Sequence, residues 1–134
     1  MLPPSVAAVL EYPGWSRAVA VEGWCARNAY QPLHVDWVAD HFRVDRKTIY
    51  RDARQVGWHD VLHLIAAARL LHVAALIMES VPTVDRVASR LRFPSTAVLY
   101  HLVKRATGKT PSELRDAGAM LVTMAFWRAR GRLG

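Results

Sequence analysis

Five cationic side chains fall within twelve residues of the first half of the chain, namely Arg43, Arg46, Lys47, Arg51 and Arg54. A guanidinium can donate two parallel hydrogen bonds to O6 and N7 of a guanine, and guanidinium and ammonium groups both pair with phosphate. Asp45 and Asp52 are the acids within this run, so it keeps a positive excess. A second run, residues 86–109, holds six cations and no acid: Arg86, Arg90, Arg92, Lys104, Arg105 and Lys109. The net charge of +7 is therefore gathered into two blocks, each with the chemistry of a polyanion-binding surface.

The two basic blocks belong to two copies of one repeated unit. The stretch VDWVADHFR, which begins at Val35, matches VDRVASRLR, which begins at Val84, at an offset of 49 residues. The register then shifts by one, and Tyr50 matches Tyr100 at an offset of 50. Each copy has the layout of a helix-turn-helix unit, which is a short helix, a tight connection and a second capped helix. A basic run on one helix is often only a solvated face, but two such runs on the second helix of a repeated unit favour nucleic-acid binding.

The elements that must position these side chains are all predicted to be helical. Apolar residues recur at helical spacing between punctuating Gly and Pro residues, and no stretch alternates as a strand would. Helices are expected at about 4–11, 16–28, 35–42, 46–56, 59–79, 84–91, 96–106, 111–117 and 118–129. The predicted fold is all-α, with two helix-turn-helix subdomains joined by a long central helix in a homeodomain-like tandem. The expected parts are an N-terminal extension (1–14), the first subdomain (15–57), the linker helix (58–80), the second subdomain (81–117) and a C-terminal helical extension (118–134).

Several of these helices have a recognisable start or end. Good N-cap residues precede four of them: Asp45, Thr83, Ser95 and Thr110. In the stretch GKTPSEL, Pro111 suits the first helical position and Glu113 can complete a capping box. Gly108 is placed to end the preceding helix in a left-handed conformation. These signals fix the boundaries of the second unit best.

In a helix-turn-helix unit the second helix lies in the major groove, so its outer face should be polar and its inner face apolar. In the first unit Ile49 and Ala53 point inward. The side chains expected to reach base edges are Lys47, Tyr50 and Arg51. The planar fork of Arg51 suits guanine, a contact that contributes roughly 1 to 3 kcal/mol of discrimination.

The second unit has a less strongly donating outer face. Leu99, Leu102, Val103 and Ala106 point inward, and the side chains expected at base edges are Thr96, Ala97, Tyr100 and His101. Phosphate contacts are expected from Arg43, Arg46, Arg54, Arg92, Lys104, Arg105 and Lys109. We therefore expect the first unit to carry most of the sequence specificity. The linker helix would be roughly 30 Å long, close to the turn of about 34 Å in B-DNA, so a monomer can present both units to successive grooves.

The stretches RLLHVAALIMESVPTVDRVASRLRF and KRATGKTPSELR, together with the two units, resemble the DNA-binding domain of the AraC/XylS transcription regulators from about Trp15 to Arg115. The resemblance implies an all-helical, two-lobed domain whose base-contacting positions fall on Lys47, Tyr50, Arg51, Thr96, Ala97 and His101. The family usually has Gly in each turn, where this chain has Arg43 and Arg92, so both turns must admit a side chain or accept strain. His34 stands where Thr or Ser usually caps, and His101 where the family often has Arg.

These observations predict a sequence-specific transcription regulator that binds double-stranded DNA and has no enzymatic activity, cofactor or metal. A protein-interaction module that has lost DNA reading is the alternative. A single cysteine and the lack of a secretion signal fit a bacterial cytoplasm. RNA polymerase and a fused or separate sensor domain are the further partners considered. Residues 118–130 are either extra core or a surface for a weak dimer, so the chain is expected to be a monomer or a weak dimer.

Three other patterns carry weaker alternatives. His59 and His63 have the spacing of two zinc ligands on a helix, but Asp60 replaces the longer Glu of metalloproteases and no third ligand follows nearby. Cys25 lacks a neighbouring His in sequence and is expected to be a small buried residue. The apolar run from Val61 to Met78 is nearly long enough to cross a membrane, but it contains charged and His side chains and reads as a buried central helix.

Overall fold

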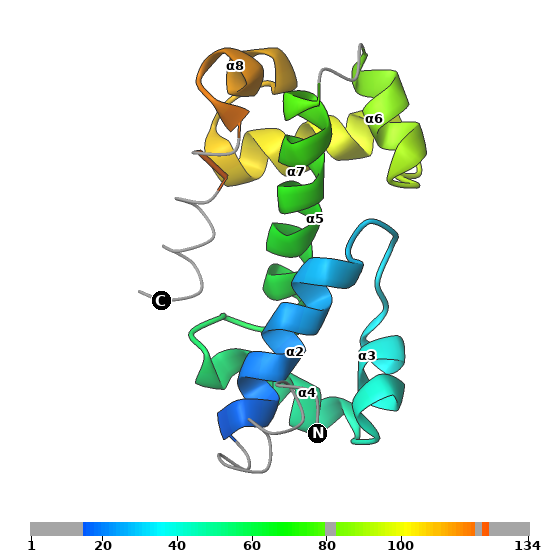
Figure 1. Cartoon of the computed structure of the whole chain (residues 1–134), viewed down its shortest axis with the longest axis vertical. Coiled ribbons are helices and arrows are strands. Elements are labelled where there is room, and N and C mark those ends of the chain that lie inside the picture. Colours follow the sequence, from blue (N-terminus) through cyan, green and yellow to red (C-terminus); the bar gives the residue numbers. More distant parts are fainter. Residues whose placement is uncertain (1–14, 80–82, 120–121, 124–134) are drawn as a thin grey trace, which may run out of the picture.

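The computed structural model describes residues 15–79, 83–119, 122 and 123, which form seven helices and no strand. The helices are α2 (Trp15–Asn28), α3 (Val35–Phe42), α4 (Arg46–Gln55), α5 (Val61–Met78), α6 (Val84–Arg90), α7 (Thr96–Thr107) and α8 (Pro111–Asp116). Figure 1 shows two lobes, α2 to α4 and α6 to α8, at the two ends of α5. The predicted all-α fold is confirmed. The helix expected at 4–11 and most of that expected at 118–129 lie outside the described residues.

Two separate apolar cores hold the lobes, and α5 takes part in both. The side chains of α5 from Val61 to Ala68 belong to the first core, with α2, α3 and α4. Those from Leu70 to Ile77 belong to the second core, with α6, α7 and α8. The boundary between the cores falls at Arg69, which is itself buried. The long helix is therefore a shared wall of both lobes rather than an exposed spacer.

Helix α5 also has the length and apolar composition of a membrane span. More than half of it, 56%, is buried inside the protein. A helix whose apolar residues are covered by other helices is the core helix of a globular fold. The prediction of a buried central helix is confirmed.

The predicted helix caps are all present. Side-chain oxygens of Asp45, Thr83, Ser95 and Thr110 each accept the N–H three residues further on. Glu113 completes the capping box of α8, and Gly108 ends α7 at a φ of 74°. One cap was missed: Asp60 accepts the N–H of His63, so α5 begins at Val61 and the expected start at residue 59 is wrong.

The turn of each unit has the same backbone path, and an arginine stands in its left-handed position. Arg43 has a φ of 56° and Arg92 a φ of 58°. In the first turn the backbone N–H of Arg43 donates to the Asp40 carbonyl (3.2 Å) and that of Val44 to the Ala39 carbonyl (3.0 Å). In the second turn the N–H of Arg92 donates to the Ser89 carbonyl (3.1 Å) and that of Phe93 to the Ala88 carbonyl (2.9 Å). This pattern is the Schellman motif, in which Gly is preferred because a Cβ is strained there. The turns therefore keep the usual backbone and accept the strain.

Candidate nucleic-acid interface

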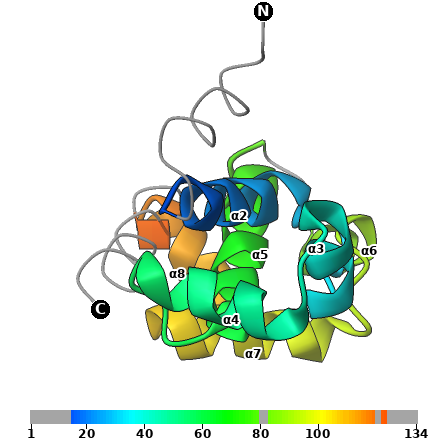
Figure 2. The ribbon, with the colours of Figure 1, turned by 90° about the horizontal axis from the view of Figure 1, so that it is seen from below.

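Helices α4 and α7 lie on the same side of the molecule. Both cross the direction of α5 in Figure 1, one near each end of it. In Figure 2, which looks along α5, both lie at the lower edge, with α5 between them and α2. The second helices of the two units thus lie on a common side of α5.

The outer face of α4 is a cationic hollow of about 700 Å³ lined by Arg46, Lys47, Tyr50, Arg51 and Arg54. The four cationic side chains of this hollow are exposed, and the Tyr50 ring is half-buried against the first core. On the opposite side of the helix Ile49 and Ala53 are fully buried, as predicted. The helix therefore separates an apolar anchor from a strongly positive surface.

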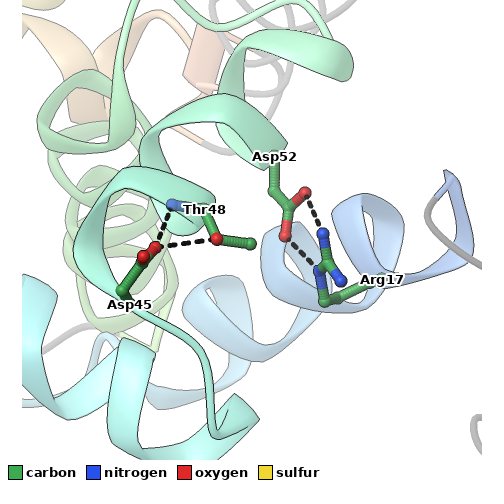
Figure 3. A network of polar contacts seen from close by, with 4 residues as sticks. All are labelled: Arg17, Asp45, Thr48 and Asp52. Atoms are coloured by element: carbon green, nitrogen blue, oxygen red, sulfur yellow. Dashed lines mark hydrogen bonds and ion pairs between the residues drawn. The ribbon is translucent and has the colours of Figure 1, made fainter.

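A partly buried ion pair joins the inner face of α4 to α2, as Figure 3 shows. The Arg17 guanidinium donates from Nε to Asp52 Oδ2 at 2.7 Å and from Nη2 to Oδ1 at 3.2 Å. The Asp52 side chain is 1% exposed, whereas that of Arg17 is 33% exposed. The hydrogen bond to Asp52 raises the pKa of Arg17 above its ordinary value. Sequence reasoning counted Asp52 only as an acid in the basic run, because nothing local indicates a partner 35 residues away.

The first turn of α4 is fixed by its own cap. Asp45 Oδ1 accepts hydrogen bonds from the Thr48 backbone N–H and hydroxyl, both at 2.8 Å (Figure 3). The side-chain and backbone bonds from Thr48 hold the pKa of Asp45 below its ordinary value. At neutral pH the cap is therefore ionised, and it stands beside the positive end of the helix dipole.

A second contact, present in both units, joins the first helix to the first residue of the second. Asp36 Oδ1 lies 3.2 Å from Arg46 Nε in the first unit. In the second unit the Thr96 hydroxyl donates to Asp85 Oδ1 at 2.5 Å. The two acids match at an offset of 49 residues and their partners at an offset of 50. The acid at the second position of each first helix thus contacts the first residue of the second helix.

The outer face of α7 is mostly neutral. Ala97, Tyr100 and His101 are exposed, and the Tyr100 and His101 rings meet edge to face at 6.4 Å. The Thr96 side chain is half-buried and its hydroxyl is already bonded to Asp85. Beneath them, Leu99 and Val103 are fully buried, and Leu102 and Ala106 are partly buried. The predicted division of α7 into two faces agrees with these exposures.

The expected phosphate-binding cations are all accessible. Arg43, Arg46, Arg54, Arg92, Lys104 and Arg105 are exposed, and Lys109 is half-buried. Lys104 also donates from Nζ to the Gly108 carbonyl at 3.1 Å, at the end of its own helix. Its ammonium therefore has a partner within the protein that the sequence did not reveal.

The histidine pair and the cysteine singled out in the sequence lie in different surroundings. His59 precedes α5, and His63 Nδ1 lies 3.0 Å from Asp60 Oδ1. In the described ranges no group of three His, Cys, Asp or Glu side chains is placed to hold a metal ion. Burial, with a smaller contribution from Glu22, raises the pKa of the Cys25 thiol to about 12. The thiol is therefore protonated at neutral pH, which is the opposite of what a nucleophile needs.

Comparison with known families agrees with this geometry. A family model described as a helix-turn-helix domain matches residues 38–117, which is more than half of the chain. The match runs from within α3 to just past α8 and covers both second helices. No curated protein and no solved structure gave a match.

Proposed function

Since the chain belongs to the helix-turn-helix family of the AraC/XylS type, which comprises DNA-binding transcription regulators, we propose that it reads two successive major grooves on one face of a duplex. In this proposal α4 lies in one groove and α7 in the next. The observation that carries it is the placement of α4 and α7 on the same side of the molecule, with α5 between them and α2 (Figure 2). Members of this family are typically not enzymes, which fits a role in DNA binding alone.

The dimensions support reading by a single chain. Helix α5 has 18 residues and is therefore about 27 Å long, and the second helices lie at its two ends. The helical repeat of B-DNA is about 34 Å, so two helices at this separation can enter neighbouring grooves. A partner copy is not needed to complete the surface.

The proposed base-reading residues are Lys47, Tyr50 and Arg51 in the first unit and Thr96, Ala97, Tyr100 and His101 in the second. Arg51 is exposed on the cationic hollow, where its fork can reach O6 and N7 of a guanine. Because the Thr96 hydroxyl is bonded to Asp85, its methyl group is the part offered to a thymine. In this proposal the seven cations expected to contact phosphate, named above, set the register of the protein on the duplex.

The proposed division of the chain and its setting follow from the same function. The two reading units are residues 15–57 and 81–117, joined by 58–80, with extensions at 1–14 and 118–134. We place the protein in the bacterial cytoplasm, where its DNA target lies. RNA polymerase and a sensor domain, fused or separate, are the partners that would turn binding into regulation.

Selection from a random pool of duplexes tests the proposal, with affinity then measured between 50 and 200 mM salt. A two-part site with half-sites about one helical turn apart is expected, because α5, which has a reading unit at each end, is about 27 Å long. The log–log slope of affinity against salt is expected to be steep, about −0.9 for each neutralised phosphate. A flat slope with no enriched sequence would instead identify a protein-interaction module.

A further inference from the structure

Arg69 is a buried cation at the boundary between the two lobes. It lies on α5 where the first core ends and the second begins, and it is 7% exposed. Its Nη1 donates to the Ala29 carbonyl at 2.9 Å, and its Nη2 donates to the Leu91 carbonyl at 2.6 Å. Ala29 follows the last residue of α2, whereas Leu91 is the C-cap of α6. One side chain therefore bonds to the ends of two helices that belong to different lobes.

The surroundings explain why a charge is tolerated there. The last carbonyls of a helix have no partner within the helix and carry the negative end of its dipole. The Arg69 guanidinium meets two such carbonyls and also lies 4.2 Å from the centre of the Phe93 ring, a cation–π contact. Burial lowers its pKa to about 10, so the group is still charged at neutral pH. Two helix ends and an aromatic face thus replace the carboxylate partner that a buried arginine usually has.

In the described part of the chain, the two lobes pack extensively on α5. Among the described helices, no extensive contact joins α2, α3 or α4 to α6, α7 or α8. His72, one turn further along α5, has its Nε2 2.7 Å from the Ala26 carbonyl, which strengthens the attachment of α5 to α2. Arg69 is the side chain that continues this attachment into the turn of the second unit.

We propose that Arg69 is a positioning residue that fixes the separation and relative rotation of α4 and α7 by tying the end of α2 to the turn of the second unit. The inference deepens the proposed function, on which its consequence for DNA rests. The fork geometry is essential, because one planar guanidinium reaches two carbonyls that a single ammonium cannot span in the same way. DNA specificity then includes the spacing between the two half-sites, which no base contact sets.

The first test needs no DNA. Spin labels at Gln55→Cys on α4 and Val98→Cys on α7, in a Cys25→Ala background, report the distance between the two helices by pulsed electron resonance. Both label positions are exposed and lie outside the proposed contacts. With Arg69 present we expect one narrow distance distribution, and Arg69→Met and Arg69→Lys are each expected to broaden it. Val21→Ala, a truncation in the first core away from Arg69, is the control and is expected to leave the width unchanged.

The second test uses the duplexes selected above, with one base pair added between the half-sites. This insertion moves one half-site by about 3.4 Å and rotates it by about 35° relative to the other. The wild type and Val21→Ala are expected to lose affinity on the order of tenfold or more. For the Arg69 variants, the logarithm of the affinity loss caused by the added base pair is expected to be less than half the wild-type value. Their affinity for an isolated half-site is expected to equal that of the wild type.

The outcomes separate the two proposals. Unchanged distance widths in both Arg69 variants overturn the positioning role, even if the protein binds DNA as proposed. A wild-type width in Arg69→Lys alone also overturns it, since charge without the fork would then suffice. Absence of any enriched duplex overturns the proposed function, and the distance measurement still decides what Arg69 does. If the Arg69 variants lose the same affinity on the selected duplexes, on those with an added base pair and on isolated half-sites, Arg69 is merely structural and the positioning role is overturned.

Discussion

The two helix-turn-helix units share a scaffold but not a surface. Both turns are Schellman motifs with an arginine in the left-handed position, and both second helices start from a side-chain cap. The two sequences match at an offset of 49 residues up to the pair Val44 and Phe93, and at an offset of 50 from the pair Asp45 and Ser95 onward. The second unit therefore has one extra residue, Pro94. An added residue in the connection leaves the helices on either side intact because the turn itself ends before it.

The difference lies on both faces of the second helix. The outer face of α4 lines a hollow with four cations, whereas the outer face of α7 is largely neutral. On the inner face Asp52 is buried and paired with Arg17, whereas the matching residue of the second unit, Leu102, is apolar and partly buried. The comparison teaches that the backbone is repeated, while the cationic hollow and the ion-paired anchor belong to the first unit.

The largest effect is expected from Arg17→Ala, which leaves the buried Asp52 carboxylate without its partner. Breaking a buried pair in this way costs about 3 to 5 kcal/mol, and the partial exposure of Arg17 reduces the expected loss to about 2 to 4 kcal/mol. Urea denaturation followed by circular dichroism measures it. The double variant Arg17→Met with Asp52→Leu imitates the apolar arrangement of the second unit and should recover most of the stability. A loss below about 0.5 kcal/mol for Arg17→Ala would mean that the two units are anchored alike.

The next effect separates the two outer faces. Arg51→Ala is expected to reduce discrimination between the selected site and a site with its guanine replaced by about 1 to 3 kcal/mol, while weak general binding remains. His101→Ala is expected to cost less, because an imidazole lacks the parallel pair of N–H donors that a guanidinium fork offers to a guanine. Competition binding with both duplexes measures each variant. Equal weakening of Arg51→Ala on every sequence would remove its base-reading role.

Much of this comparison was available from the sequence. The repeat, the helix caps and the period of apolar residues are local signals, and they predicted the all-α fold and both second helices. The family match over residues 38–117 supports the same interpretation. The contacts that hold the site together were not predicted, since Arg17 and Asp52 are 35 residues apart and Arg69 reaches a carbonyl 40 residues away. Such partners are chosen by tertiary packing, which single-sequence periodicity does not encode.

The start of α5 shows a different kind of failure. Asp60 is a good N-cap residue, but the helix was expected to start at about residue 59, one position before it. The zinc-ligand pattern required His59 to lie on the same helix as His63. Because Asp60 caps α5, His59 lies before the first residue of that helix. Local capping chemistry is therefore the better guide when it conflicts with a spaced pair of ligands.

The strained turns offer a third test of the comparison. Arg43→Gly and Arg92→Gly should each raise the free energy of unfolding by about 1 kcal/mol, because glycine adopts the left-handed conformation without a Cβ clash. If these arginines contact phosphate, the same variants bind every duplex more weakly. Arg43→Asn and Arg92→Asn are matched controls, since asparagine tolerates the conformation but carries no charge. Higher stability with unchanged affinity would leave the turn arginines without a role in binding.

The smallest effect compares one position in the two units, Arg54 and the matching Lys104. Each phosphate contact contributes about 0.9 to the log–log slope of affinity against salt, so Arg54→Ala should reduce the slope by about that amount. Lys104→Ala should reduce it less, because the ammonium is already bonded to the Gly108 carbonyl and must exchange this partner for a phosphate. Titrations of both variants on the selected duplex at four salt concentrations measure the difference. If Lys104→Ala lowers the slope as much as Arg54→Ala, the two cations contribute equally to phosphate binding. The two units then differ only in how they read bases.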